Sequence, residues 1–288
     1  MKSREIVLLE IKRVCQEKVA ELFQKGIPDE VQTRYEKEIQ YLEKSKYFDE
    51  FEKVYIESQI NKGMMCSKGT ISGSFLYFLM TEKGYNPLKP YYYCKMCGYY
   101  EPVEKYQNCI DASDKCCPEC GNKIKASGYN VAIESVWGLD GKKAIGFERE
   151  DIIHPVVEKR LKQLVAEFKP RTFEDKIKLC ACASNGYSWE ATGDEELDLA
   201  KFKEIFEKCE FLTREELYDK LCAKGIKPLD AYKASEFVRK GGVAKRQRET
   251  KKYEITEAVL GLAHHFVYLE SRAHAIQTAY QYWIKNSH

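Results

Sequence analysis

The sequence predicts a mainly helical α+β fold with a small sheet and an inserted zinc ribbon. The helical part follows from apolar residues that recur every three or four positions, first between residues 4 and 24. The ribbon follows from two C-x-x-C pairs in the middle of the chain. For the sheet, the apolar stretch Met64-Met65-Cys66 is compatible with a buried strand just before a loop of small polar residues.

Four helices are expected in the first third of the chain. The first covers residues 4–24 and stops at Gly26, and Pro28 opens the second because proline suits the first turn of a helix. A third helix is expected from about Asp49 to Asn61. A fourth is expected from Phe75 to Thr81.

Capping and breaking residues place further helices in the second half of the chain. One helix is expected from Asp151 to Phe168. Thr213-Arg214-Glu215-Glu216 has the pattern of a capping box, in which the Thr and Glu side chains each accept a bond from the other residue's backbone amide. Gly225 and Pro228 separate the next two helices, and Gly241-Gly242 ends the second of them.

The two cysteine pairs are separated by nineteen residues and predict a structural zinc site, whose ligands are Cys94, Cys97, Cys117 and Cys120. Zinc prefers four ligands in a tetrahedron, and thiolates suit it. Gly98 and Gly121 follow the second cysteine of each pair, where the turn often needs a positive φ. The alternatives are a disulfide pair or four unrelated thiols. Cys116 can compete as a ligand, but its spacing is worse.

The remaining composition indicates a cytoplasmic protein. The chain has 288 residues, twelve cysteines and a net charge of +2, and it shows no secretory leader, which favours a reducing compartment. No apolar run approaches the ~20 residues of a membrane span, so no membrane partner is expected. The tyrosines at 91–93 and 99–100 flank the ribbon, where packing over the zinc knuckles is favoured over stacking on bases.

A strand, a small polar loop and a helix follow one another between residues 64 and 81. Such an arrangement can bind phosphates through free backbone amides, hydroxyls and a lysine, and the loop from Ser67 to Ser74 offers all three. The pattern is not a Walker motif, and a Gly/Ser-rich loop is more often an ordinary turn.

The chain from about Ile27 to Glu148 resembles the palm region of PolC-type DNA polymerase III, the Gram-positive replicase α subunit. Cys66 to Ser74 matches the family loop G-S-R-G-S-V-G-S-S, which holds the triphosphate of the incoming nucleotide. Asn86 to Cys97 matches N-P-L-x-P-H-Y-x-C-x-x-C, and Cys117-Pro118-Glu119-Cys120-Gly121 closes the family's zinc-binding insertion. Glu36-Lys37-Glu38 resembles the family helix that leads into the loop.

This resemblance implies a deoxynucleoside triphosphate as a ligand of the loop. The residues implied to contact its phosphates are Ser67, Lys68, Gly69, Thr70, Ser72, Gly73 and Ser74.

A second block resembles the fingers of the same family. Three family motifs have counterparts in this block. The motif R-P-K-T-F is similar to Lys169-Pro170-Arg171-Thr172-Phe173, and S-V-R-K-G is similar to Ser235 with Val238-Arg239-Lys240-Gly241. The motif K-A-H-A is similar to Arg272-Ala273-His274-Ala275. In the family these elements lie near the nascent base pair. The resemblance therefore implies DNA contacts at Arg239, Lys240, Arg272 and His274.

A basic stretch in the same block adds Lys245, Arg246 and Arg248 to the expected DNA contacts. Residues 224–252 contain ten basic and three acidic residues, a balance that favours salt-sensitive, largely sequence-blind binding to a phosphate backbone. The alternative is an ordinary solvated run of charges.

The catalytic aspartates of the family are not retained. Alignment from Gly141 to Ile145 places the family's D-x-D on Gly146 and Glu148. Two-metal catalysis needs carboxylates that share magnesium ions; glycine supplies no ligand, and the longer arm of Glu148 misplaces its carboxylate. The family segment with a third aspartate is missing. No residue is assigned a catalytic role with confidence, and Mg²⁺ is expected only if polymerase activity is retained.

Four segments are expected along the chain. Residues 1–85 form a helical palm-like region with the phosphate-binding-type loop, and residues 86–130 form the zinc ribbon insertion. Residues 131–169 form a palm remnant, contributing to a small palm-remnant sheet, and a connecting helix. Residues 170–288 form a helical fingers-like domain.

The sequence therefore predicts a truncated, catalytically inactive PolC-like protein that binds primer-template or single-stranded DNA. Deoxynucleoside triphosphates and replisome proteins are expected as further partners, in the replication of a host or a mobile element. Two alternatives stay open. One is a minimal active nucleotidyltransferase with relocated carboxylates near Glu148, Glu150 and Asp151. The other is a replisome protein-interaction module without DNA binding.

Overall fold

The computed structural model describes residues 3–60, 67–68, 70–81, 84–143, 145–149, 152–184, 199–200, 203, 206, 211–241 and 268–284. The expected strand Met64-Met65-Cys66 lies outside the described residues. The chain divides into two compact units. The first comprises Met1–Ile153, Arg171–Glu174 and Ile276–His288, and the second comprises His154–Pro170 and Asp175–Ala275. The four sequence-based segments stay a prediction.

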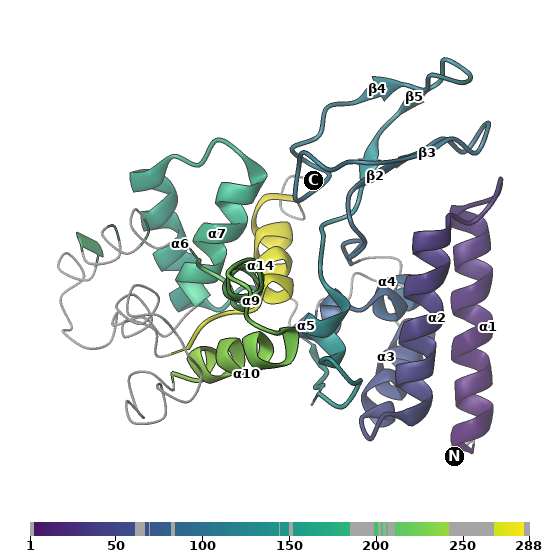
Figure 1. The fold of residues 1–288 in the computed structure, drawn as a ribbon, viewed down its shortest axis with the longest axis horizontal. Helices are drawn as coiled ribbons and strands as arrows, with labels where there is room; N and C mark the ends of the chain where they lie inside the picture. The colour runs from purple at the N-terminus through teal and green to yellow at the C-terminus, as the bar shows by residue number, and fades with distance from the viewer. Residues whose placement is uncertain are drawn as a thin grey trace. The chain divides into compact units, whose positions relative to one another are not determined.

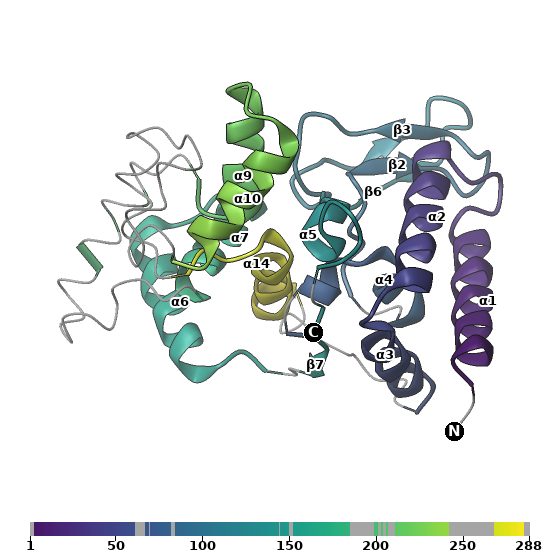
Figure 2. The same ribbon diagram turned by 60° about the horizontal axis from the view of Figure 1, so that its bottom comes forward.

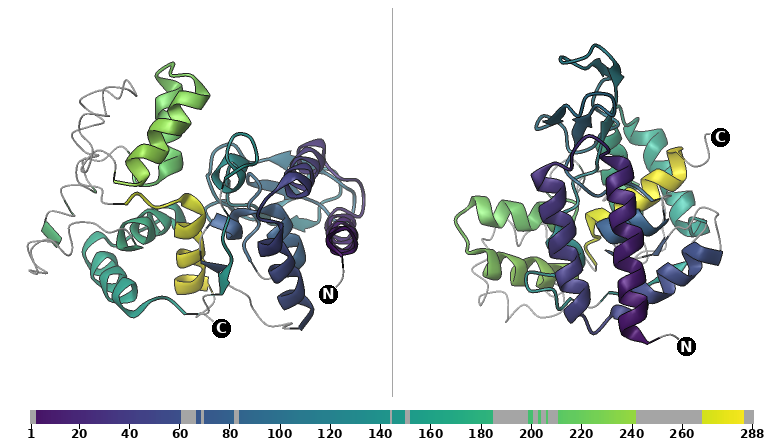
Figure 3. Two further views of the ribbon diagram at one scale, coloured as in Figure 1. Left: turned by 90° about the horizontal axis from the view of Figure 1, so that it is seen from below. Right: turned by 90° about the vertical axis from the view of Figure 1, so that its right-hand side faces the viewer.

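The first unit begins with the four expected helices, namely α1 (Arg4–Leu22), α2 (Asp29–Lys44), α3 (Phe48–Ile60) and α4 (Phe75–Thr81). α1 and α2 lie side by side in Figures 1 and 3. The short helix α4 contacts α1, α2 and α3. A further short helix, α5 (Ile133–Trp137), packs against α2 and the 3-10 turn η1 (Thr70–Gly73).

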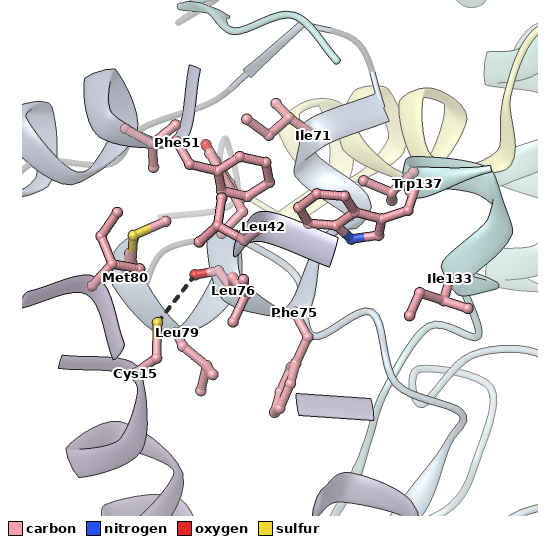
Figure 4. Close-up of a cluster of buried hydrophobic side chains, with 14 of the residues drawn as sticks. Cys15, Leu42, Phe51, Ile71, Phe75, Leu76, Leu79, Met80, Ile133 and Trp137 are labelled. Atoms are coloured by element: carbon pink, nitrogen blue, oxygen red, sulfur yellow. Dashed lines mark hydrogen bonds between the residues drawn. The ribbon is translucent and has the colours of Figure 1, made fainter. Parts of the chain in front are cut away.

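The main hydrophobic core lies between these helices (Figure 4). The Trp137 ring stacks on Phe51 with 4.9 Å between ring centroids, and both side chains are fully buried. Cys15 is also fully buried, and its thiol lies 3.9 Å from the carbonyl oxygen of Leu76. Burial raises the pKa of Cys15, so this thiol stays protonated and packs as a small hydrophobe.

The strands form three small antiparallel sheets. β1 (Ser67–Lys68) pairs with β7 (Glu148–Arg149), and β4 (Lys115–Cys116) pairs with β5 (Lys123–Ile124). The third sheet has the order β3-β2-β6. Its strands are Tyr100–Pro102, Tyr91–Tyr93 and Ala126–Ser127. Strands β2 to β5 project beyond one end of α1 and α2 (Figures 1 and 3).

The tyrosines of β2 join the ribbon to the helical core because side chains alternate across a strand. Tyr91 and Tyr93 contact Phe23, with ring centroids 5.8 Å and 5.0 Å apart. Tyr92 points to the other side and belongs to the small ribbon core with Cys94 and the residues Ala112, Cys117 and Ile124. The expected packing of tyrosines over the knuckles therefore holds for Tyr92, and Tyr99 packs on the same cluster.

The second unit is helical where the structure describes it. α6 (Pro155–Phe168) is shorter than expected: it begins at Pro155 and not at Asp151, because proline occupies the first turn and the His154 ring caps it by accepting from the Val156 amide at 3.3 Å. Two further helices are divided between the units, α7 (Phe173–Ser184) and α14 (Arg272–Ala279). The second unit contains α7 from Asp175 onward and α14 up to Ala275.

Two helices of the second unit form a side-by-side pair, α9 (Arg214–Ala223) and α10 (Pro228–Arg239), visible in Figure 2. The predicted capping box starts α9: Thr213 accepts from the Glu216 amide, and Glu216 accepts from the Thr213 amide.

None of the helices in the described part of the chain is both long and apolar enough to cross a membrane.

Candidate functional site

The four predicted zinc ligands converge at the end of the ribbon. The sulfur atoms of Cys94, Cys97, Cys117 and Cys120 all lie within 4.8 Å of one another. The Cys94 and Cys120 sulfurs are 3.4 Å apart, and those of Cys97 and Cys117 are 3.5 Å apart. A tetrahedron of Zn–S bonds about 2.3 Å long requires sulfurs roughly 3.8 Å apart. These four thiols can therefore hold a metal ion, and all four are free cysteines without a disulfide.

The backbone of both C-x-x-C turns is built alike. The Gly98 amide donates to the Cys94 carbonyl at 2.8 Å, and the Gly121 amide donates to the Cys117 carbonyl at 2.9 Å. Both glycines have the predicted positive φ, +86° and +74°. Each turn thus folds its two cysteines onto the same side.

Hydrogen bonding prepares one of the thiols to bind as a thiolate. The Asn122 side-chain amide lies 3.2 Å from the Cys120 sulfur, and together with the Asn122 backbone it lowers the pKa of Cys120 to about 6. For Cys97, the Tyr99 amide lowers the pKa, but desolvation and the neighbouring thiols outweigh it and raise the pKa to about 12. Metal ligation by cysteine requires the thiolate and releases its proton. Cys116 is exposed on β4 and is not part of the cluster.

The structure pairs the beginning of the predicted phosphate loop with Glu148, one of the two residues that the sequence analysis aligns with family aspartates. β1 and β7 are paired so that Ser67 lies opposite Arg149 and Lys68 lies opposite Glu148. Gly69 lies outside the described residues. The expected loop is therefore a two-residue strand followed, from Thr70 to Gly73, by the 3-10 turn η1.

The backbone before Glu148 is firmly held. Ile145 is buried in the main core, and the Phe147 amide donates to the Glu50 carboxylate at 2.9 Å. Burial opposes ionisation of Glu50, but its bonds from Lys53 and from the Phe147 amide leave its pKa lowered. Gly146 is exposed, and an added Cβ at that position would meet nothing within 4 Å. There is therefore room for a side chain at Gly146, the residue that the sequence analysis aligns with a family aspartate.

The end of the loop is bonded to a carboxylate of the same chain. Glu38 on α2 is fully buried. It accepts from the Ser74 hydroxyl at 2.5 Å, from the Phe75 amide at 3.0 Å and from the Leu76 amide at 3.4 Å. Arg34 donates to it at 2.6 Å.

The predicted DNA-contact residues of the second unit differ in exposure. Lys240 is exposed. Arg239 is half-buried, makes three hydrogen bonds to Glu236 and donates to the Tyr268 hydroxyl at 2.7 Å. Arg272 is buried, and its backbone amide donates to Glu215 at 2.7 Å. His274 is half-buried, 3.9 Å from Glu270. Lys245, Arg246 and Arg248 lie outside the described residues.

Two carboxylates with several hydrogen bonds are not predicted as functional from the sequence. Glu38 is predicted only as part of a helix, and no role is predicted for Asp111. Asp111 lies in the ribbon between the cysteine pairs and accepts from the Phe173 amide at 2.6 Å and from the Glu174 amide at 3.0 Å. The only sequence signal for Glu38 is an acidic residue whose helical position coincides with the apolar stripe of Val31, Tyr35 and Leu42.

Comparison with known proteins identifies relatives for just under half of the chain. It is 32% identical over 148 residues, 47% of the chain, to a protein named DNA polymerase III PolC-type from Streptococcus sanguinis. It is 31% identical over 147 residues to the protein of that name from Streptococcus pneumoniae, and 27% identical over 138 residues to that from Thermotoga maritima, each match covering 46% of the chain. The chain spans about a tenth of the length of these curated relatives.

No protein-family model matches the chain. The relatives nevertheless carry the name of the family that the sequence resembles. Close to half of the chain is thus homologous to a fragment of PolC-type DNA polymerase III.

Proposed function

We propose that this chain is a PolC-like protein that binds DNA and the phosphates of a nucleotide but does not polymerise. The observation that carries the proposal is the 32% identity to PolC-type DNA polymerase III over 47% of the chain. The name of the relative specifies a DNA polymerase, so primer-template or single-stranded DNA is the partner we propose. Replisome proteins follow as further partners.

Zinc is the metal we propose for the ribbon, because four thiolates in two C-x-x-C turns are its usual structural donor set. Its role there is structural. The ribbon core contains only five buried residues, Tyr92, Cys94, Ala112, Cys117 and Ile124, so it has little apolar surface with which to stabilise itself. Metal binding supplies folding free energy to modules of this kind.

The proposed lack of activity rests on Gly146. The family position has room for a side chain, but glycine offers no carboxylate to a metal ion. Without a shared pair of carboxylates, magnesium ions are not held where they can activate the primer hydroxyl and stabilise the leaving group.

Fluorescence anisotropy of a labelled primer-template tests the DNA-binding proposal. Titrations are run at about 50 and 200 mM salt, with and without Mg²⁺ and the next correct deoxynucleoside triphosphate. The expected result is salt-sensitive binding that tightens with the nucleotide, with no primer extension in Mg²⁺ or Mn²⁺. An absence of binding at the lower salt concentration would overturn the proposal.

A minimal active nucleotidyltransferase is the second candidate. The pairing of β1 with β7 favours it, because the register places Glu148 opposite Lys68 of the loop. Primer extension in Mg²⁺ or Mn²⁺ that is abolished by Glu148→Gln would establish this candidate and contradict the inactive one.

A replisome interaction module without DNA binding is the third candidate. It is favoured by the bonds of Arg239 to Glu236 and Tyr268, which occupy a residue expected to contact DNA. This candidate requires that no DNA binding occurs at low salt and that a purified replisome protein binds the chain with a measurable dissociation constant.

A further inference from the structure

The junction between the candidate phosphate loop and α4 has a complete set of internal hydrogen bonds. The Ser74 amide donates to the Ile71 carbonyl at 2.9 Å, and the Phe75 and Leu76 amides donate to Glu38. The Tyr77 amide donates to the Ser74 hydroxyl at 3.4 Å. The amides that a helix start leaves without intrahelical partners are therefore all bonded within the protein.

The Glu38 carboxylate at this junction is bonded both to Arg34 and to the first amides of α4. Arg34 donates to Glu38 through Nε, and its other nitrogens donate to the Val131 carbonyl at 2.9 Å and to the Gly73 carbonyl at 3.3 Å. A buried carboxylate is stable only with a paired charge and hydrogen bonds, and Glu38 has both. The same arginine connects α2 to the last residue of η1.

A negative charge thus already occupies the position at the start of α4. A second anion there would lie next to the Glu38 carboxylate, and like charges in a buried site repel strongly. A phosphate can bind only to the earlier part of the loop, where the residues with suitable side chains are Ser67, Lys68 and Thr70. Ser72 is fully buried and does not face solvent.

We propose that Glu38 is a positioning residue for the nucleotide site, and that Ser74 binds Glu38 and not a phosphate. The proposal rests on the phosphate-binding role proposed above for the loop. Glu38 accepts from Ser74, and Arg34 donates to the Gly73 carbonyl, so this ion pair fixes the C-terminal end of η1. Ser74 is therefore removed from the phosphate contacts that the family resemblance implies.

Titration with a fluorescent deoxyadenosine triphosphate and Mg²⁺ tests the proposal at a temperature well below the unfolding midpoint of every variant. Ser74→Ala is expected to lower that midpoint but to keep the affinity within about twofold, because Arg34 still holds the Gly73 carbonyl and the Phe75 and Leu76 amides still bond to Glu38. Lys68→Ala is expected to weaken binding by about tenfold, as for a lost charged contact to phosphate. A wild-type protein that does not bind the nucleotide would contradict the phosphate site itself.

Chemical rescue provides the second readout. Glu38→Ala removes the carboxylate and leaves room for a small anion between Arg34 and the start of α4. Added sodium formate is expected to raise the unfolding midpoint of this variant and to restore its nucleotide affinity, with no effect on the wild type beyond that of sodium chloride. If Ser74→Ala weakens nucleotide binding as much as Lys68→Ala does, or if formate does not rescue Glu38→Ala, the positioning role is wrong.

Discussion

The ribbon cysteines differ in exposure, and this difference makes metal ligation testable residue by residue. Cys97, Cys120 and Cys116 are exposed, whereas Cys94 and Cys117 are buried. A thiolate bound to zinc shares its lone pair with the metal, so it reacts slowly with an alkylating reagent. Cys116 lies beside the site but outside the cluster and provides a matched control.

Iodoacetamide labelling read by peptide mass spectrometry should therefore separate these cysteines. In the metal-loaded protein we expect Cys116 to be labelled and Cys120 to be protected. After chelation, Cys120 should become labelled quickly because its pKa is lowered, whereas Cys15 should stay unlabelled in both states because burial raises its pKa. Equal labelling rates of Cys120 and Cys116 before chelation would show that the cluster does not hold a metal.

Gly128 occupies the most restricted glycine position next to the ribbon. Its φ is +113°, and an added Cβ would lie 2.7 Å from the Leu88 carbonyl oxygen and 2.6 Å from that of Lys89. Gly128→Ala should destabilise the first unit by about 2–4 kcal/mol, through a strained φ and a clash with backbone. Thermal unfolding of the zinc-saturated protein measures the effect.

Gly121 provides the control for this substitution. Its φ of +74° is also unfavourable for alanine, but its Cβ would meet nothing within 4 Å. Gly121→Ala should therefore cost only about 1 kcal/mol. If the two substitutions have the same effect, the close approach of Leu88 and Lys89 does not constrain Gly128.

At the residue scale, sequence reasoning predicted what depends on near neighbours. The four cysteines and the positive φ of Gly98 and Gly121 follow from spacings of three or four residues. The role of Glu38 could not be predicted in this way, because its partners Ser74 and Phe75 lie 36 and 37 residues further along the chain. Only the folded chain shows that this carboxylate, and not a ligand, lies at the start of α4.

At the scale of elements, Asp111 caps the first two residues of α7, Phe173 and Glu174, which belong to the same unit as Asp111. Asp111 accepts from the amides of Phe173 and Glu174, and the fully buried Asn108 supports it with a bond of 2.8 Å to the same carboxylate. Asp111→Ala should cost about 1–2 kcal/mol, the usual loss for a capping side chain. Hydrogen exchange of the first-turn amides of α7 should become faster.

Asp114 provides a matched substitution in the same stretch of the ribbon. It pairs only with the exposed Lys123 and Lys125, at 3.3 Å and 3.8 Å. Surface pairs of this kind contribute about 0–1 kcal/mol, so Asp114→Ala should leave exchange in α7 unchanged. An equal effect of the two substitutions would mean that Asp111 does not act as a cap.

The bounds given for α1, α3 and α4 and the start of α2 were predicted to within one or two residues, whereas α5 and the start of α6 were not. α1 to α4 have their stop and start residues next to them in sequence, as with Gly26 and Pro28. For α6, acidic residues suggested an earlier start, but Pro155 and the His154 cap determine it. β1 and β7 contain two residues each, too few for any periodic pattern, and their pairing joins positions about 80 residues apart.

At the scale of the whole molecule, the similarity to a polymerase does not specify which cations contact DNA. Arg239 was expected to do so from the resemblance, but it is bonded to Glu236 and Tyr268. Arg272 is buried. The sequence does not distinguish an arginine that pairs with a carboxylate of the same chain from one that binds a phosphate, because both appear as a basic residue in a polar helix. Lys240 is exposed and begins the basic stretch that continues beyond Gly241.

The DNA-binding proposal therefore depends mainly on Lys245, Arg246 and Arg248. Their simultaneous change to glutamate should weaken primer-template binding by at least about tenfold, and should reduce the slope of log K against log salt by up to about 0.9 for each lost phosphate contact. The control changes Lys25, Lys44 and Lys46, all exposed in the first unit, to glutamate and so alters the net charge equally. If the basic stretch contacts DNA directly, only the first variant should lose affinity for the primer-template, because a contact is local. A loss of equal size in both variants would mean that only the overall field of the protein attracts DNA, and the basic stretch would then have no specific role.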